Sequence, residues 1–217
     1  MIVLLVVAKA PVPGFAKTRL CPPATPEQAA GIAAAALLDT LDAVLSTPDA
    51  EVVVAMTGTL ADAAAAPEIA AALRATTVIP QRGHGFAARL ANAHADTAAL
   101  HAGLPVLQIG MDTPQVTPGL LTSSAAGLAG ADAVLGAAED GGWWALGLRD
   151  PRHAAALAAV PMSTAETGAR TREALVARGL TVGSLPTLSD VDTMADARRV
   201  ADGRDGRFRG AVAVVAS

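Results

Sequence analysis

The sequence predicts an α/β fold of Rossmann-like type, in which a mostly parallel central sheet carries helices on both faces. Two observations predict it. Residues 2–7 are continuously apolar and rich in β-branched side chains, as expected for a central strand that is covered on both faces. Apolar strand-like runs then alternate four times with longer Ala- and Leu-rich segments, and this alternation is typical of βαβ units.

The expected elements follow in a regular order. After the first strand, Thr25 and Pro26 begin a long helix that extends to Ser46, because Thr is a good N-cap and Pro is tolerated in the first helical turn. Further strands are expected at residues 51–56, 76–79, 106–110 and 133–137, and helices at 60–74, 86–100 and 118–128. Beyond residue 137 we expect a strand at 143–148, a helix at 166–178, a short strand at 181–185 and a last helix from Met194.

Length and composition limit the class of protein. A chain of 217 residues fits one large α/β domain, and with 52% hydrophobic but only 2% aromatic residues its core must be built from Ala, Val, Leu and Ile. The net charge is −4 and the basic residues are scattered, so a nucleic-acid partner is not expected. The apolar start is too short for a membrane span and lacks the features of a signal peptide, which predicts a cytoplasmic protein without membrane association. Cys21 is the single cysteine, so no disulfide framework is expected.

Basic residues gather directly after the first strand. Lys9, Lys17 and Arg19 lie in the segment AKAPVPGFAKTRL, in which Gly14 allows a turn. Ligands of open α/β sheets bind beyond the carboxyl ends of the strands, so this loop is expected to meet phosphate groups. It is not a Walker loop, because proline and alanine stand where that motif needs its glycines. An exposed basic loop that only aids solubility is the alternative.

Two groups of aspartates are candidate metal ligands. Asp112 follows the strand at 106–110 and precedes Pro114, which prevents a helix from continuing there. Asp190 and Asp192 alternate around Val191, so in an extended segment both carboxylates face one side. Mg²⁺ or Mn²⁺ needs only one or two carboxylates when phosphates supply further oxygens. The alternatives are a local turn at Asp112 and a helix cap at Asp192.

The segment AEDGGWWALGL contains both tryptophans of the chain. Its two acids, of which Asp140 is the second, are followed by two glycines that allow the backbone to approach a ligand closely. Because successive strand residues point to opposite faces, only one of Trp143 and Trp144 is expected to line a pocket while the other packs in the core. A tight turn into a hairpin strand explains the glycines but not the adjoining acids.

Together the motifs AKAPVPGFAKTRL, GMDTPQ, AEDGGWWALGL and SDVDTMAD resemble those of a family of GT-A-like nucleotide-diphospho-sugar transferases. This family is described as a domain of unknown function and as glycosyltransferases linked to arsenosugar pathways. The resemblance covers residues 2–196 with the motifs in order. Phospholactate guanylyltransferases are related, and their early loop carries a stretch similar to Lys17-Thr-Arg-Leu20.

The resemblance implies a GT-A fold, a nucleoside diphosphate-sugar or NTP donor, a small-molecule acceptor, and Mg²⁺ or Mn²⁺ as cofactor. Carried over by motif, it implies a catalytic role for Asp140 and Lys17, metal binding by Asp112, Asp190 and Asp192, and donor binding by Lys9, Gly14, Lys17, Arg19, Gln81 and Arg89. The family stretch Q-x-G-x-D-L-G-x-R-L is similar to residues 81–90, but Gly85 replaces its acid and Ala87 its second glycine.

Three functions follow as hypotheses. The first is metal-dependent glycosyl transfer from a nucleoside diphosphate-sugar, the second is nucleotidyl transfer from an NTP, and the third is a nucleotide- or sugar-binding module without catalysis. We expect a nucleotide-binding half at about residues 1–137, an acceptor half at about 138–202 and a tail at 203–217. A serine hydrolase is not expected, since no serine lies in a G-x-S-x-G setting.

Overall fold

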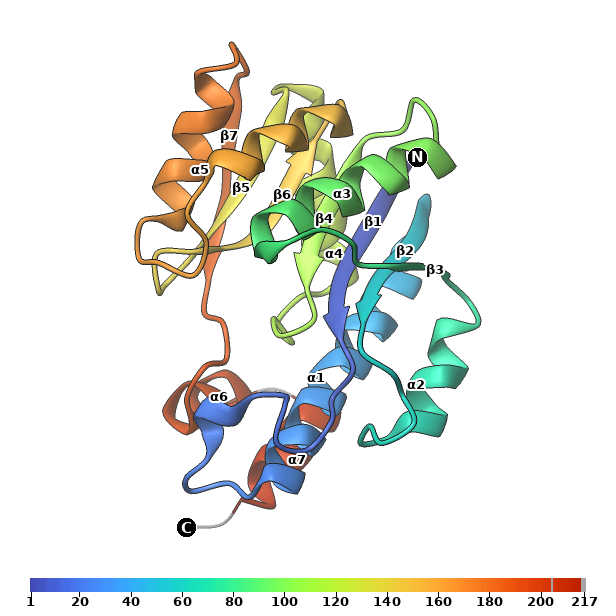
Figure 1. Ribbon diagram of the computed structural model, residues 1–217, viewed down its shortest axis with the longest axis vertical. Helices are drawn as coiled ribbons and strands as arrows, with labels where there is room; N and C mark the ends of the chain where they lie inside the picture. The colour runs from blue at the N-terminus through green and yellow to red at the C-terminus, as the bar shows by residue number, and fades with distance from the viewer. Residues whose placement is uncertain (204, 216–217) are drawn as a thin grey trace.

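The sheet is the centre of the computed structural model, which describes residues 1–203 and 205–215 (Figure 1). Its strands have the order β3-β2-β1-β4-β6-β5-β7. They are β1 (Ile2–Lys9), β2 (Ala50–Thr57), β3 (Thr77–Pro80), β4 (Val106–Gly110), β5 (Ala133–Ala138), β6 (Trp143–Leu148) and β7 (Val182–Leu188). Strand β6 runs antiparallel to its neighbours β4 and β5, and every other neighbouring pair is parallel.

Helices cover both faces of the sheet. One face packs against α1 (Pro26–Leu45), α2 (Ala66–Leu73) and α4 (Pro118–Ala126), and the other against α3 (Gly85–Leu100), the 3₁₀ helix η3 (Pro151–Ala159) and α5 (Thr167–Val176). In Figure 1, α3 and α5 lie in front of the sheet and α1 behind it. The predicted Rossmann-like fold with helices on both faces is confirmed.

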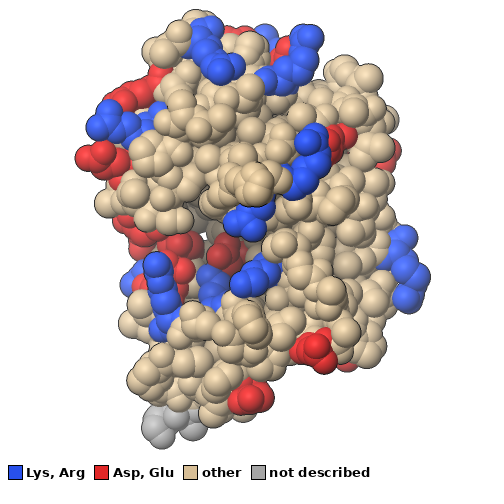
Figure 2. All heavy atoms as spheres, in the orientation of Figure 1, with Lys and Arg blue, Asp and Glu red and all other residues tan. Residues whose placement is uncertain are grey.

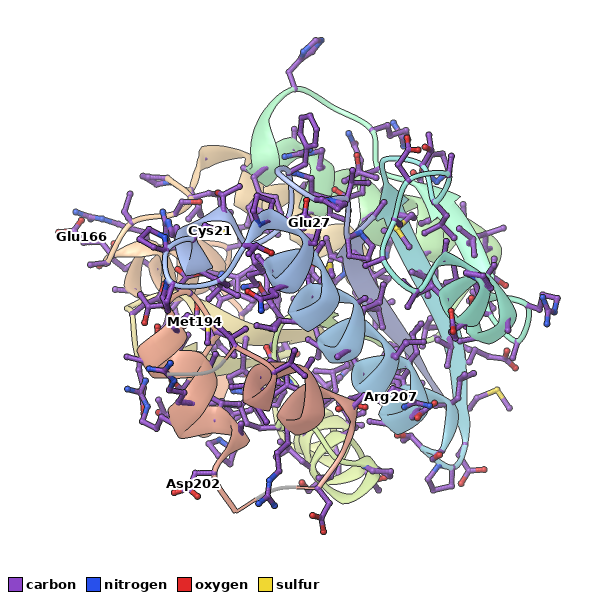
Figure 3. The ribbon with its side chains drawn as sticks, turned by 90° about the horizontal axis from the view of Figure 1, so that it is seen from below. Cys21, Glu27, Glu166, Met194, Asp202 and Arg207 are labelled. Carbon is purple, nitrogen blue, oxygen red and sulfur yellow. The ribbon has the colours of Figure 1, made fainter. Side chains whose placement is uncertain are left out.

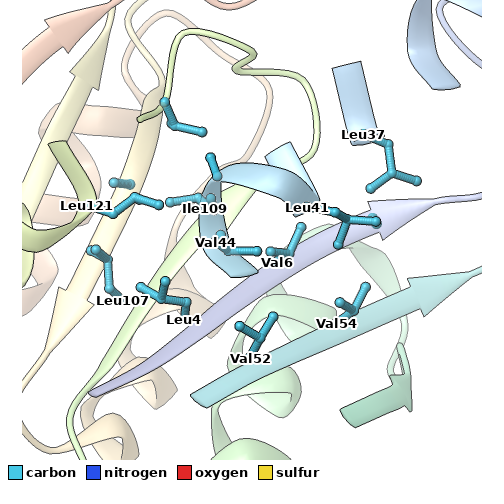
Figure 4. Packing of buried hydrophobic residues seen from close by; sticks show 14 of the residues in the cluster. Leu4, Val6, Leu37, Leu41, Val44, Val52, Val54, Leu107, Ile109 and Leu121 are labelled. Atoms are coloured by element: carbon cyan, nitrogen blue, oxygen red, sulfur yellow. The ribbon is translucent and has the colours of Figure 1, made fainter. Parts of the chain in front are cut away.

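Strand β1 shows why the sheet is buried on both faces. Leu4 and Val6 pack toward Leu41 and Val44 of α1, while Leu5 belongs to the core on the opposite face (Figure 4). Each fully buried side chain of this size stabilises the fold by about 1.5–3 kcal/mol. Helix α1 is long and apolar enough to cross a membrane by composition, but 72% of that segment is buried within the fold. Packing therefore explains its apolar character.

A third apolar cluster joins the two ends of the chain. It contains residues of the 3₁₀ helix η1 (Thr18–Leu20), the first half of α1, α6 (Met194–Ala201) and α7 (Arg207–Ala213). Figure 3 shows α6 and α7 beside α1, with Arg207 against that helix. Arg207 forms an ion pair with Asp39 at 3.2 Å. The part of the tail that the structure describes therefore forms a helix, which the sequence had not predicted. The same cluster includes Leu20 of the basic loop and Val191 of the segment that leads into α6.

Most element boundaries agree with expectation to within two residues, but β7 extends to Leu188 instead of ending at residue 185, and some elements differ in extent or type. Helix α2 begins at Ala66 rather than at residue 60, because Pro67 is tolerated only in the first turn. The segment expected as one helix at 118–128 ends its α-helical part at Ala126 and continues as the 3₁₀ turn η2 (Gly127–Ala129). Helix η3, which begins after the capping residue Asp150, was not expected.

Candidate functional site

A cavity of about 730 Å³ opens where strands β1 and β4 end and β6 begins. A volume of this size is typical of a small-molecule site. Lys9, Gln81 and Arg89 lie in its lining from the first half of the chain, and Asp140 and Trp143 from the second. Figure 2 shows the hollow, with acidic side chains inside it and basic side chains around its rim. The site therefore lies where open α/β sheets bind ligands.

Lys17 and Asp112 form an ion pair beside this cavity. The Lys17 ammonium donates to Asp112 Oδ2 at 2.8 Å and also to the carbonyl oxygen of Val191. Burial alone lowers the pKa of Lys17, but the carboxylates of Asp112, Asp192 and Asp190 outweigh it and raise that pKa above its ordinary value. Burial likewise raises the pKa of Asp112, and Lys17 outweighs it, so the pKa of Asp112 is lowered. The charges of the two groups compensate each other.

Lys17 reaches this position through an unusual backbone conformation. Its φ is 48° and its ψ is 41°, in the left-handed region that non-glycine residues seldom occupy. Strain of this kind persists where surrounding contacts enforce it. Here the ammonium connects three segments that are distant in the sequence, namely the loop after β1, the end of β4 and the loop before α6.

Three carboxylates converge on the other side of the site. Asp140, Asp190 and Asp192 each present one oxygen, and these oxygens lie within 4.8 Å of one another. Asp140 lies in the turn between β5 and β6, and the other two lie in the loop between β7 and α6. The pKa of Asp190 is raised to about 6, first by burial and then by the negative charges of Asp140, Asp192 and Asp112.

We call Asp140, Asp190 and Asp192 the acidic triad, and it fits a divalent cation. Hard cations such as Mg²⁺ and Mn²⁺ take oxygen ligands and need few carboxylates when a substrate supplies phosphate oxygens. A cation would relieve the repulsion that raises the pKa of Asp190. We expected Asp112 beside Asp190 and Asp192, but the structure places Asp140 there and holds Asp112 against Lys17. A metal-binding role for Asp112 stays a prediction.

Arg199 of α6 connects the two segments that carry the triad. Its guanidinium donates to Ser189 Oγ at 2.7 Å, to Asp196 Oδ1 at 3.0 Å and to Glu139 Oε2 at 3.2 Å. Glu139 precedes Asp140 in the sequence, and Ser189 precedes Asp190. Arg199 therefore holds the two loops together against the repulsion between their carboxylates. No sequence motif described above contains Arg199.

Close packing requires glycine at the first position after Asp140. Gly141 has a φ of 88°, and a Cβ there would lie 2.0 Å from the carbonyl oxygen of Ala165. Asp140 Oδ1 accepts a hydrogen bond of 2.7 Å from the backbone N–H of Gly142, which holds the carboxylate against the backbone of the turn. The turn is thus both a hairpin connection and the support of a triad residue.

The two tryptophans divide their roles. Trp144 is 2% exposed and donates to the carbonyl oxygen of Pro186 at 2.9 Å, so it belongs mainly to the core. Trp143 is partly buried, lies in the lining of the cavity and donates to Thr171 Oγ1 at 3.1 Å. Trp144 lies in the cavity lining as well, so the prediction that only one of the two tryptophans would line a pocket is wrong.

The basic residues differ in their access to the cavity. Lys9 and Arg19 lie in its lining, where Lys9 donates to the carbonyl of Phe15 at 2.7 Å and Arg19 to Asp192 at 2.7 Å. Lys17 lies instead in the lining of an adjoining cavity of about 270 Å³, which shares Asp112 and Asp192 with the larger one. Phosphate contacts by these three residues stay a prediction.

Gln81 and Arg89 also lie in the cavity lining. Gln81 donates to the carbonyls of Ala8 and Ala55 at 2.8 and 2.9 Å, which ties β3 to the sheet. The Arg89 guanidinium lies 5.7 Å from the ring centroid of Phe86, within the range of a cation–π contact. Gly14, with a φ of 78°, supplies a turn in the basic loop but lies in the lining of neither cavity.

Comparison with known proteins places the chain in a family. The model of the family described as "Uncharacterized protein conserved in bacteria (DUF2064)" matches residues 40–164, more than half of the chain. The chain belongs to this family. The resemblance inferred from the four motifs is thereby confirmed. A search of the curated proteins gives no match.

Solved structures share the fold of this family member. A protein from Desulfovibrio desulfuricans, provisionally named a nucleotide-diphospho-sugar transferase, superposes with a TM-score of 0.83 at 24% identity over 98% of this chain and 94% of its own. A cytidylyltransferase from Leptospira borgpetersenii superposes with a TM-score of 0.58 at 12% identity, over 99% of this chain and 94% of its own. A Mycobacterium tuberculosis protein solved as a manganese complex superposes with a TM-score of 0.55 at 22% identity, over 94% of this chain and 100% of its own. At these identities the likeness shows the fold.

Proposed function

We propose that the protein is a divalent-metal-dependent transferase that uses a nucleotide-activated donor, and that it transfers a glycosyl group from a nucleoside diphosphate-sugar to a small acceptor. The observation that carries the proposal is the acidic triad, which faces a cavity of nucleotide size whose lining also contains Lys9, Arg19 and Arg89. Anionic and cationic groups in one cavity suit a ligand that brings both phosphates and a metal ion.

The basic residues would bind the phosphates of the donor. Negative charge builds up on the phosphate oxygens as the bond to the leaving group breaks, so fixed cations at this place lower the barrier. Lys9, Arg19 and Arg89 can supply this charge from the cavity lining, while Lys17 holds Asp112 and the loop before α6 in place. A divalent cation held by Asp190 and Asp192 would add Lewis-acid stabilisation of the same oxygens.

Asp140 is suited to act on the acceptor. It lies in the turn that leads to Trp143, and Trp143 forms part of the second half of the cavity. A carboxylate within reach of an acceptor hydroxyl can take its proton as the hydroxyl attacks. We assign the acceptor to this half of the chain, at about residues 138–202, and the donor to the half at about 1–137.

Nucleotidyl transfer from an NTP is the second candidate. The same cations would then stabilise a departing pyrophosphate, and three basic residues at the end of β1 and in the loop that follows it suit a triphosphate. The fold shared with a cytidylyltransferase favours this candidate. The two reactions differ in the attacked atom, which is an anomeric carbon in the first and an α-phosphorus in the second.

Product release separates the candidates. The protein would be incubated with Mn²⁺ and a panel of nucleotide sugars and NTPs with small acceptors, and the release of nucleoside diphosphate and of pyrophosphate would be measured. Asp192→Asn should abolish release, and Asp62→Asn, at an exposed position outside the cavity, should not. Nucleoside diphosphate release supports glycosyl transfer, and pyrophosphate release supports the second candidate. Mn²⁺-dependent binding without either product would indicate a binding module.

A further inference from the structure

One polar side chain in the cavity lining is not explained by packing. Gln108 lies in β4 among apolar neighbours and is 2% exposed. It lies in the lining of the large cavity, and its Oε1 is buried without a hydrogen-bond partner among the described residues. A buried polar atom without a partner destabilises the folded protein, because it has given up its hydrogen bonds to water. A ligand bound in the cavity would give this polar side chain a function.

A second polar side chain lies behind Gln108. His94 of α3 is fully buried, and neither of its ring nitrogens has a hydrogen-bond partner among the described residues. Burial lowers the pKa of His94 to about 4, an effect that neighbouring Gln108 opposes. The ring is therefore neutral at physiological pH and carries one N–H donor. The two side chains thus lie close together, outside normal hydrogen-bonding geometry.

Gln81 provides the contrast within the same cavity. Its amide nitrogen donates to two backbone carbonyls, so the structure accounts for this glutamine by its hydrogen bonds. Gln108 lies deeper and makes no such bond. Two glutamines lie in one cavity lining, and only one of them is satisfied by the protein itself.

We propose that Gln108 is a specificity-determining residue that donates its amide N–H to an uncharged oxygen of the bound donor, with His94 as its positioning residue. The inference rests on the proposed function. On binding, the neutral imidazole donates its N–H to Gln108 Oε1, and the amide nitrogen then faces the cavity as a donor. The partner is a carbonyl of the nucleotide base or a hydroxyl of a sugar, since both offer the same acceptor chemistry.

The test combines stability with ligand affinity. Calorimetric titration in Mn²⁺ would use UDP, UDP-glucose, GDP, GDP-mannose, CTP and GTP as probes. For the probe that the parent binds most tightly, Gln108→Leu should lower affinity about 10- to 100-fold, as expected when one polar contact is lost. The same variant should raise the Tm of the ligand-free protein, because an unsatisfied buried group is removed. Gln81→Leu should lower that Tm, because two carbonyls lose their donor.

Two arms refine the assignment. A loss shared by UDP and UDP-glucose places the contacted oxygen on the nucleotide, and a loss confined to UDP-glucose places it on the sugar. His94→Leu should weaken probe binding, and His94→Gln should restore it. The double variant with His94→Leu and Gln108→Leu should lose no more probe affinity than Gln108→Leu alone, because the two residues act through one contact.

The outcomes separate this inference from the proposed function. Unchanged probe affinity together with a lower Tm in Gln108→Leu would make the residue structural and overturn the inference alone. Additive losses in the double variant would overturn the positioning role of His94. A parent protein that binds none of the probes in Mn²⁺ would overturn the proposed function, and the inference with it.

Discussion

Two aspartates of one cavity have opposite electrostatic environments. Asp112, at the end of the first half of the sheet, lies 2.8 Å from the Lys17 ammonium, and its pKa is lowered. Asp190, from the second half, lies among other carboxylates, and its pKa is raised to about 6. The residue type is the same and both lie in the lining of the same cavity. The difference is the charge that each finds beside it.

The comparison separates two uses of a carboxylate. At Asp112 the protein supplies its own cation, so the pair is complete without a ligand and holds the loops together. At the acidic triad the negative charges exceed the cations nearby, and an external cation would complete the site. The first half thus contributes most of the basic groups of the cavity, and the second contributes the excess acid.

The largest effect is expected within the triad itself. Asp140→Asn should lower kcat about 10²- to 10⁴-fold, the usual contribution of a general base, while Mn²⁺ affinity falls much less than kcat because Asp190 and Asp192 stay in place. Steady-state kinetics and Mn²⁺ titration of the same preparation would measure both. Equal losses of kcat and of Mn²⁺ affinity would make Asp140 a ligand instead of a base.

Asp112→Asn tests the paired aspartate. It leaves the Lys17 ammonium, whose side chain is 13% exposed, without its main partner. We expect a loss of about 2 kcal/mol in the free energy of unfolding, less than for a fully buried pair because the Asp112 side chain is 39% exposed. Urea denaturation would measure it. Glu173→Gln, which breaks an exposed pair with Arg170, is the control and should change the free energy of unfolding far less, because solvent screens that pair. An equal loss of unfolding free energy in the two variants would show that the Lys17–Asp112 pair stabilises the fold no more than an exposed pair does.

Asp190→Asn should have the opposite effect. In the folded protein Asp190 keeps its proton up to about pH 6, against an ordinary value of 3.8. The stability that this provides is present at low pH and is lost as the pH rises toward 6. The variant should therefore have a higher Tm than the metal-free parent above pH 6 and a similar one near pH 4.

The same variant should lose the stabilisation that Mn²⁺ gives the parent. Thermal unfolding from pH 4 to 8, with and without Mn²⁺, measures both effects. A lower Tm of the variant at pH 7 without metal would show that Asp190 is stabilised by its surroundings, contrary to this account.

Arg199 gives the smallest expected effect. Arg199→Ala should weaken Mn²⁺ binding about three- to tenfold, because the guanidinium that holds the two triad loops together is lost. Arg199→Lys keeps the charge but carries it on a shorter side chain than the arginine whose Nη2 reaches all three acceptors, so it should restore only part of the affinity. Titration with Mn²⁺ checks the order of the three proteins. Unchanged affinity in Arg199→Ala would show that the loops hold the triad without this residue.

Much of the fold follows from local pattern. The buried run of β1 and the Thr25 cap of α1 predict elements that the structure contains almost residue for residue. The tail was different, because α7 is stabilised by the contact of Phe208 with a cluster built from both ends of the chain. No local pattern of residues 203–217 specifies that contact.

The sequence indicated which aspartates would lie in the cavity, but it did not indicate which of them would pair with Lys17. Strand-end positions indicated that Asp112, Asp140, Asp190 and Asp192 would share one cavity, and all four lie in its lining. Which carboxylate meets Lys17 depends on the left-handed backbone of that residue and on the path of two loops, and sequence spacing does not determine either. Gln108 carried a signal, since a glutamine inside an apolar strand is a buried polar group.

The most direct test is to locate the cation. Crystals grown with Mn²⁺ and a bound nucleotide would be measured at the manganese absorption edge, and an anomalous difference map would be calculated. We predict one peak within coordination distance of the Asp190 and Asp192 carboxylates, with Lys17 still paired to Asp112. A peak on Asp112 with Lys17 displaced, or a nucleotide bound in the cavity with no peak at the triad, would contradict it.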